Sequence, residues 1–238
     1  MISQIEWFIT NLGLVRYQEA HKLQTDIIEA RHYGSLDKDI VLMLEHPPVF
    51  TLGRRGGRQN ITVGENVLCD QGIDVVSIER GGDITFHGPG QQVVYLLVDL
   101  RARGMDIPDF VRSLEEVMIR TAKDQKIDAL RDVRNPGVWV QGNKLGSIGI
   151  AIRHGITFHG FALNVNIDLT PFQWIHPCGL KGVSMTSLAA SKKCEIDMGA
   201  VQKSVEKHLQ SVLNIQLKPV SREELGRLAN FHAPAINE

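Results

Sequence analysis

The feature that most constrains this chain is the stretch at residues 80–92, which reads Arg-Gly-Gly-Asp-Ile-Thr-Phe-His-Gly-Pro-Gly-Gln-Gln. It lies between two strand-like runs, 73–78 and 93–100, that are rich in β-branched residues. Four glycines and one proline are too many for a two-residue hairpin, and they fit a backbone with unusual φ values that comes close to a bound molecule. Its large apolar residues argue against disorder. The sequence therefore predicts a ligand-contacting loop, in which Arg80 is a fixed cation and His87 titrates near neutrality.

Composition and charge exclude several classes of protein. The 238 residues are 43% hydrophobic and 22% charged, as in ordinary globular domains. The formal net charge of −1 argues against a generally basic nucleic-acid binder. No apolar run approaches the ~18 residues that a membrane span needs, and residues 1–9 lack the basic start and apolar core of a signal peptide. We therefore expect neither a nucleic-acid nor a membrane partner.

Three arginines, Arg54, Arg55 and Arg58, stand out locally because no acidic residue lies among them. They could face an acidic partner or a phosphate group. They could equally form a solvated loop, and the sequence leaves both interpretations open.

The three cysteines, Cys69, Cys178 and Cys194, leave an odd number for pairing and form no CxxC motif. This usage is typical of free thiols in a reducing compartment, so we expect a cytoplasmic protein. A zinc site built from Cys178, Cys194 and His176 is disfavoured, because zinc ligands usually come in close sequence pairs. We therefore expect no metal site.

Apolar patterning predicts one α+β domain, residues 1–238, with a mixed, largely antiparallel sheet flanked by helices. Turns of hairpin size at 141–144 and 153–155 place three successive strands in an antiparallel meander. A largely helical segment, about 180–238, is expected to pack on this domain. Predicted strands are 5–9, 40–44, 49–53, 137–140, 144–152 and 156–165, and predicted helices are 15–32, 199–213 and one that begins at Pro108.

Small residues interrupt the large apolar ones within the meander, at Gly146, Gly149, Gly160 and Ala162. Glycine weakens a strand, so it is typical of places where another molecule or backbone comes close. A bulge or tight helix packing would explain any one glycine, but it explains the set less well. Together with the glycine-rich loop, these residues predict a narrow apolar groove that suits an extended aliphatic chain.

Cys178 is the best candidate for a nucleophile. It lies between a proline and a glycine, a turn in which a buried, purely structural thiol is hard to place. Only the thiolate is nucleophilic, so the residue needs a nearby cation or base. Lys144, at the start of an apolar strand, is one candidate partner, and His87 and His176 are others. The residue types alone do not choose among them.

Several motifs, in their order along the chain, strongly resemble those of the octanoyltransferases of lipoate biosynthesis. The resemblance covers roughly residues 45–188 and implies the fold shared by lipoate and biotin protein ligases. The motifs are His-Pro-Pro-Val-Phe-Thr-Leu-Gly-Arg at 46–54, the glycine-rich stretch at 80–92, Lys-Leu-Gly-Ser-Ile-Gly at 144–149, Phe-His-Gly-Phe-Ala-Leu-Asn-Val at 158–165 and Pro-Cys-Gly at 177–179.

This resemblance implies transfer of an octanoyl group from acyl carrier protein to a lysine on a lipoyl domain, with no cofactor. The acceptors would be 2-oxoacid dehydrogenases and the glycine cleavage H protein. Cys178 becomes the acyl-accepting nucleophile, and Lys144 the residue that lowers the pKa of its thiol and shuttles protons. The implied substrate-contacting residues are Arg80, Gly81, Gly82, Asp83, Ile84, Thr85, Phe86, His87, Ser147, Ile148, Gly149, Gly160, Phe161 and Ala162.

Bond energies are consistent with this chemistry. A thioester and a cysteine exchange an acyl group nearly evenly, and forming an amide from a thioester is downhill, so the two-step transfer needs no ATP. An ATP-dependent lipoate or biotin ligase on the same fold is the main alternative, but it works through an adenylate and needs no nucleophilic thiol. A non-catalytic acyl-carrier-binding protein is the second alternative, and it would have no use for both Cys178 and Lys144.

Overall fold

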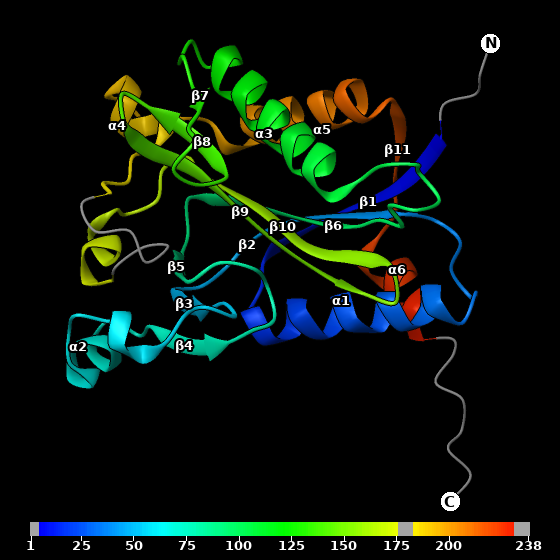
Figure 1. Cartoon of the computed structure of the whole chain (residues 1–238), viewed down its shortest axis with the longest axis horizontal. Coiled ribbons are helices and arrows are strands. Elements are labelled where there is room, and N and C mark those ends of the chain that lie inside the picture. Colours follow the sequence, from blue (N-terminus) through cyan, green and yellow to red (C-terminus); the bar gives the residue numbers. More distant parts are fainter. Residues whose placement is uncertain (1–4, 176–182, 231–238) are drawn as a thin grey trace, which may run out of the picture.

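The computed structural model describes residues 5–175 and 183–230. Its strands form an eight-stranded sheet in the order β11-β1-β2-β6-β10-β9-β8-β7 and a three-stranded sheet in the order β4-β3-β5 (Figure 1). In the large sheet β1 pairs in parallel with β2 and β11, and the other pairs are antiparallel, which confirms the mixed, largely antiparallel α+β fold. The strands of the large sheet are β1 (Ile5–Leu14), β2 (Ile40–Glu45), β6 (Gln91–Leu97), β7 (Leu130–Arg131), β8 (Gly137–Val140), β9 (Asn143–Arg153), β10 (Ile156–Asn164) and β11 (Ile215–Pro219).

Helices cover both faces of the large sheet (Figure 1). On one face α3 and α5 pack against each other, and Leu114 of α3 shares an apolar core with Phe161 of the sheet. On the other face α1 packs against α6, and Ile27 of α1 shares a second core with Leu42. The helices are α1 (Tyr17–His32), α3 (Ile107–Asp124), α4 (Leu188–Lys192), α5 (Met198–Leu213) and α6 (Arg222–Asn230).

Two of these helices begin at aspartate caps. The side chain of Asp106 accepts a hydrogen bond from the N–H of Asp109 at the start of α3, and Pro108 lies in the first turn. Asp197 likewise accepts from the N–H of Gly199 at the start of α5. Both helices begin within one residue of the positions that the sequence predicts.

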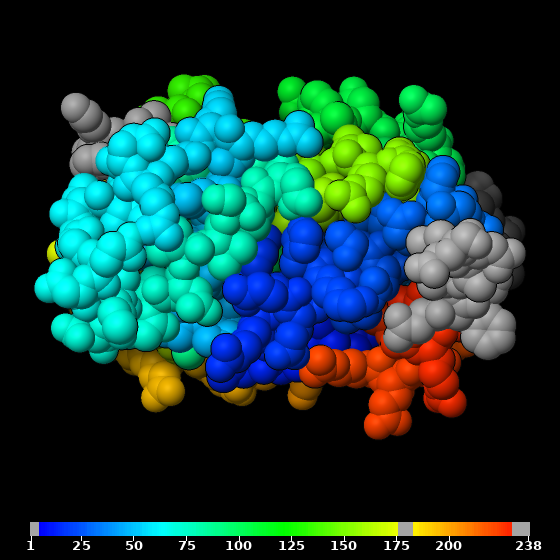
Figure 2. Space-filling model, turned by 90° about the horizontal axis from the view of Figure 1, so that it is seen from below, coloured from blue at the N-terminus to red at the C-terminus, as the bar shows by residue number. Residues whose placement is uncertain are grey.

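The three-stranded sheet has its own apolar core, and its surface adjoins that of α1 (cyan and blue in Figure 2). One of its strands corrects the sequence analysis, because Ile84–His87 was predicted as loop and forms β5, antiparallel to β3. Phe86 packs edge-on against Phe50 of β3, with ring centroids 5.5 Å apart, and this burial outweighs the local glycine content. The elements here are β3 (Val49–Leu52), β4 (Asp74–Ser77), β5, the short helix α2 (Glu65–Asp70) and the 3₁₀ turns Arg58–Asn60 and Thr170–Trp174.

The segment about 180–238 was expected to be largely helical, and it also contains a strand. β11 joins the edge of the large sheet beside β1, in register from Ile215 opposite Ile5. Only the first residue of β11, Ile215, is buried. Ile215 and Leu217 do alternate with Gln216 and Lys218, but two apolar residues before a proline are too short a pattern to distinguish a strand from a helix.

Two of the small residues in the meander serve packing within the protein. A Cβ on Gly160 would lie 2.1 Å from the carbonyl oxygen of Val94 on β6, so only glycine permits this strand pairing. A Cβ on Gly146 would lie 2.6 Å from Sδ of Met118 on α3. Gly146 therefore allows α3 to pack closely against β9, and it does not line the cavity. Tight helix packing was one of the two explanations that the sequence left open for such a glycine.

We expect Gly160→Ala to lower the free energy of unfolding by about 3 kcal/mol, because the new methyl group would meet backbone that cannot move without opening the β6–β10 ladder. Gly226→Ala is the matched control. Gly226 lies within α6 with nothing within 4 Å of its Cβ position, so this change should raise the free energy of unfolding by ~0.5–1 kcal/mol. Urea denaturation measures both, and similar small effects would contradict the tight pairing at Gly160.

Candidate active site

Two of the predicted substrate-contacting segments are direct partners across β9 and β10. Residues 147–149 pair with 160–162, and Gly149 faces Gly160. Side chains directly opposite each other in an antiparallel pair are nearest neighbours. Two motifs that are separate in the sequence therefore form one continuous surface.

The glycine-rich loop is fixed above this surface by Arg80. Its guanidinium Nη2 donates to the carbonyl oxygen of Thr51 at 2.7 Å and to Oγ1 of Thr51 at 2.9 Å. The N–H of Gly81 donates to the carbonyl oxygen of Ile150 on β9 at 3.0 Å. A Cβ on Gly149 would lie 2.8 Å from Cδ of Arg80, so the loop can cross β9 only at a glycine. Arg80 is thus a buried cation that holds the loop in place.

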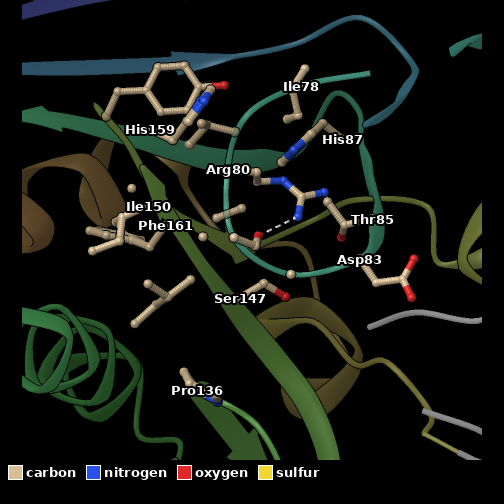
Figure 3. A pocket seen from close by; sticks show the side chains of 18 of the residues that line it. Ile78, Arg80, Asp83, Thr85, His87, Pro136, Ser147, Ile150, His159 and Phe161 are labelled. Carbon is tan, nitrogen blue, oxygen red and sulfur yellow. Dashed lines mark hydrogen bonds between the residues drawn. The ribbon is translucent and has the colours of Figure 1, made fainter. Parts of the chain in front are cut away.

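Loop and strands enclose a cavity of about 220 Å³ (Figure 3). Ile148, Ile150 and Phe161 give it apolar walls. Among the implied substrate contacts, residues 80–85, 87, 147–149 and 160–162 all line the cavity. Phe86 is the exception, because its ring packs in the core of the small sheet. Contact of the lining residues with an acyl chain stays a prediction.

The arginine-rich segment has three different environments. Arg54 and Arg55 are exposed, and Arg55 also lines the cavity. Arg58 forms an ion pair with Glu65 on α2. Only part of this segment therefore offers positive charge beside the cavity.

His87 does not titrate near neutrality as the sequence predicted. Burial, aided by the charges of His46 and Arg80, lowers its pKa to about 3. Its Nδ1 lies 2.7 Å from Oε1 of Gln91, and because that oxygen can only accept, Nδ1 carries the hydrogen. His87 is therefore a neutral imidazole of defined tautomer and a poor general base.

A buried chain of hydrogen bonds links His87 to the strand that carries Lys144. Nε2 of Gln91 donates to Oδ1 of Asn164 at 2.8 Å. Nδ2 of Asn164 donates to the carbonyl oxygen of Thr186 at 2.9 Å. The N–H of Thr186 in turn donates to the carbonyl oxygen of Lys144 at 2.9 Å. The sequence analysis missed Gln91 and Asn164, although each lies inside a motif that it quoted.

A second buried polar group adjoins the cavity and was also missed. It consists of Tyr17, His46, Tyr95 and His159, of which only His46 and His159 belong to motifs. Nε2 of His46 lies 2.7 Å from the Tyr95 hydroxyl, and Nδ1 of His159 lies 3.5 Å from the Tyr17 hydroxyl. Burial lowers the pKa of His46 to about 4 and that of His159 well below its ordinary value, and it raises the pKa of both tyrosines. All four side chains are therefore uncharged at neutral pH.

Lys144, the predicted proton shuttle, is 1% exposed on β9. Its Nζ donates to Oδ1 of Asn135 at 2.5 Å and lies 5.3 Å from the centre of the Trp139 ring. Asn135 itself lines the cavity, beside Pro136. The ammonium group therefore lies just behind the cavity wall, held by an amide that the sequence analysis did not identify.

Cys178 and its alternative neighbour His176 lie in 176–182, outside the described residues. The described chain resumes directly beside Lys144. The N–H of Lys144 donates to the carbonyl oxygen of Ser184 at 2.9 Å, and Met185 forms a parallel β-bridge with Lys144. Residues 184–186 are thus anchored to the strand of Lys144.

The fold belongs to a known class of protein. Residues 16–210 match the lipoyl protein ligase A/B catalytic domain. In structure, 94% of the chain superimposes on a lipoate-protein ligase A bound with ATP, covering 93% of that chain with a TM-score of 0.74 and 18% identity. A putative lipoate protein ligase from Thermoplasma acidophilum with bound lipoic acid also matches, with a TM-score of 0.71 and 19% identity. This match covers 94% of the present chain and 93% of the other chain. A biotin protein ligase from Aquifex aeolicus shares the fold more distantly, with a TM-score of 0.56 and 13% identity. This match covers 87% of the present chain and 70% of the other chain. The chain is a member of the lipoyl protein ligase A/B catalytic domain family.

Within that family the sequence relatives are octanoyltransferases. The octanoyltransferase of Desulfotalea psychrophila is 50% identical over 198 residues, which cover 82% of this chain and 89% of that protein. That of Syntrophotalea carbinolica is 44% identical over 209 residues, 88% of this chain and 95% of the relative. The chain therefore belongs to the octanoyltransferases, which are acyltransferases of protein lipoylation.

Two expectations from composition can also be compared with the structure. Within the described parts of the chain, none of the helices is long and apolar enough to cross a bilayer. Cys69 and Cys194 are exposed free thiols.

Buried neutral histidines predict a loss of stability in acid. The unfolded chain protonates histidine near pH 6.5, whereas the folded protein keeps His46 neutral down to about pH 4 and His87 down to about pH 3. The stability they provide is fully present above pH 6.5 and falls from there towards these folded-state pKa values, by up to ~1.4 kcal/mol per pH unit for each residue. We expect His87→Gln to reduce the slope between pH 6.5 and pH 4, measured by urea denaturation at several pH values. An unchanged slope for His87→Gln would be inconsistent with a neutral buried His87.

Proposed function

We propose that this chain transfers an octanoyl group from octanoyl-acyl carrier protein to a lysine of lipoyl domains, through a thioester on Cys178. The observation that carries the proposal is the position of Lys144, whose buried ammonium group is held by Asn135 beside an apolar cavity. Membership in the octanoyltransferases supports the octanoyl group. The narrow, apolar shape of the cavity suits an extended aliphatic chain.

Chain length supports a pairing of Cys178 with Lys144. Cys178 lies six positions before Ser184, whose carbonyl oxygen accepts from the N–H of Lys144. Six residues span at most ~20 Å when fully extended. This length permits the thiol to approach the Lys144 side chain, as the proposal requires.

In the first step the Cys178 thiolate attacks the carbonyl carbon of the octanoyl thioester. A carbon–sulfur bond to Cys178 forms, and the bond to the carrier-protein sulfur breaks. The Lys144 ammonium favours the thiolate before attack and then gives a proton to the departing carrier-protein thiolate. We expect backbone N–H groups of the 80–92 loop or of the turn at Cys178 to bind the oxyanion. The products are the acyl-enzyme and a neutral Lys144.

In the second step the amine of the lipoyl-domain lysine attacks the acyl-enzyme. Its lone pair forms the amide bond, the Cys178 thiolate leaves, and neutral Lys144 takes the proton that the amine loses. Lys144 and Cys178 thereby return to their starting ionisation states. Because a thioester is converted into an amide, the step is downhill and consumes no nucleotide.

The proposed partners are the acidic surfaces of acyl carrier protein and of lipoyl domains, including those of 2-oxoacid dehydrogenases and the glycine cleavage H protein. Arg54 and Arg55 are exposed, and Arg55 reaches the cavity, so they are suited to attract acidic proteins. We propose a cytoplasmic location, which fits the free thiols of Cys69 and Cys194.

The covalent route is tested by incubation with octanoyl-acyl carrier protein in the absence of nucleotide. We expect intact-mass analysis to show one added octanoyl group and subsequent transfer to a lipoyl domain. Cys178→Ala should abolish both, a loss of at least ~10³-fold, because the nucleophile is gone. Cys69→Ala and Cys194→Ala should leave transfer nearly intact. Transfer that requires ATP would identify an adenylating ligase, and near-normal turnover of Cys178→Ala would refute the thioester.

A second prediction concerns the charge of Lys144. Lys144→Met should raise the pH at which Cys178 reacts with iodoacetamide towards the ~8.5 of an ordinary thiol, because the neighbouring cation is lost. Lys144→Arg should keep the low pH of alkylation and slow transfer to the lipoyl domain more than acylation, because arginine keeps the charge but does not shuttle protons.

Asn135→Ala supplies the matched control for position. It leaves Lys144 in place but removes the oxygen that accepts from Nζ, so we expect an intermediate alkylation profile and partial loss of transfer. Superimposable alkylation profiles for the wild type and Lys144→Met would show that Lys144 does not tune the thiol.

A further inference from the structure

Three metal-ligating side chains from distant parts of the sequence converge next to the cavity. His21 lies on α1, Glu79 directly precedes Arg80, and His159 lies on β10. One ring nitrogen of each histidine and one carboxylate oxygen of Glu79 all lie within 4.8 Å of one another. Two imidazoles and one carboxylate are a ligand set that zinc uses in sites with an open fourth position.

His159 provides a second, independent observation. Its side chain is 2% exposed, and its Nε2 has no hydrogen-bond partner among the described residues. Its backbone has a φ of +58° within a strand, a conformation that residues other than glycine rarely adopt. The backbone N–H donates to Oε1 of Gln24 at 2.7 Å, which helps to hold this conformation. The fold thus fixes a buried imidazole in a strained position and leaves one of its nitrogens unused.

We propose that His21, Glu79 and His159 bind a divalent transition-metal ion of the zinc type, with water completing the coordination. This site is separate from the cysteine site considered from the sequence, and it does not depend on the proposed acyl transfer. The side chains of His21 and Glu79 are 26% and 38% exposed, so an ion can enter from solvent. Figure 2 shows the blue surface of α1 beside the teal surface of the adjoining glycine-rich segment, on this side of the molecule.

The arrangement around His159 matches that of an established metal ligand. Nδ1 of His159 lies 3.5 Å from the Tyr17 hydroxyl. A metal-bound imidazole generally directs its other nitrogen to an oxygen acceptor, which fixes the ring and its tautomer.

Two arginines oppose a cation at this place. Nη2 of Arg153 lies 3.7 Å from Oε1 of Glu79 and competes for its carboxylate. The positive charge of Arg80 also acts on His159. Metal binding must therefore displace Arg153 from Glu79, and removal of the Arg153 charge should strengthen it.

Occupancy of this site would tie three elements together. The ion would join α1 and β10 to the segment that leads into the glycine-rich loop. Because His159 and residues 80–85 line the cavity, the stability of the cavity wall would then depend on the metal.

The test is Zn²⁺ titration in competition with a chromophoric chelator, on full-length protein in which Cys69, Cys178 and Cys194 are replaced by serine to remove thiolate ligands. We expect one zinc ion per chain. His21→Asn and Glu79→Gln should each weaken binding by about tenfold or more, a difference of ~1.4 kcal/mol. Arg153→Met should strengthen it. Bound Co²⁺ should show the visible absorption of a tetrahedral site with nitrogen and oxygen ligands.

His154→Asn is the matched control. His154 stacks on His32 with ring centroids 3.9 Å apart and lies 3.8 Å from Glu29, so it forms a surface histidine pair next to a carboxylate. Its replacement should leave the affinity for zinc unchanged. The proposal would be overturned if the protein that retains His21, Glu79 and His159 did not compete with the chelator for zinc. It would also be overturned if His154→Asn and His21→Asn weakened zinc binding equally. His21 is partly exposed on α1, so His21→Asn tests the site without disturbing the strained strand at His159.

Discussion

The cavity depends on the clamp that holds the glycine-rich loop over β9. Arg80 is buried and donates to Thr51 on β3, while Gly81 donates to β9. The Arg80 side chain and the Gly81 backbone together therefore join the small sheet to the large one. The absence of a side chain at Gly149 lets Arg80 pass close enough for this contact. A buried guanidinium is stable only where carbonyl oxygens receive its hydrogen bonds, so the clamp also explains why the loop is ordered despite its glycines.

Burial of polar groups determines the chemistry available around the cavity. His46, His87 and His159 are kept neutral by desolvation, which excludes them as general bases that act near neutral pH. Neutral imidazoles and amides can still fix geometry through directed hydrogen bonds. The chain through Gln91 and Asn164 does so, because it connects the cavity wall to Thr186 and from there to Lys144. Polar residues near the cavity thus position the segment around Lys144, the residue that we propose transfers protons.

Local patterns predicted much of this fold, and long-range contacts account for what they missed. The meander and the long helices follow from apolar patterning, hairpin turns and the proline at 108, which are visible over a few residues. β5 was missed because Phe86 is stabilised by Phe50, more than thirty residues earlier. The candidate site could likewise be predicted only where local sequence motifs supply it. Motifs indicated most of the cavity lining, whereas Tyr17 and Asn135 reach it from segments without a motif, and the neutrality of His87 comes from tertiary burial.

The same architecture serves both ATP-dependent ligases and this octanoyltransferase, so the scaffold does not dictate how the acyl group is activated. A ligase must supply the energy of an adenylate, whereas a thioester donor already carries an activated acyl group. What an acyltransferase needs instead is a nucleophile that holds the acyl group between two protein partners, and a group that gives and takes one proton. For the second need we propose Lys144, which is buried next to the cavity and donates from its Nζ to the amide oxygen of Asn135. An amide oxygen can accept a hydrogen bond from either the ammonium or the amine form of lysine, so this contact can persist while the proposed proton transfer takes place.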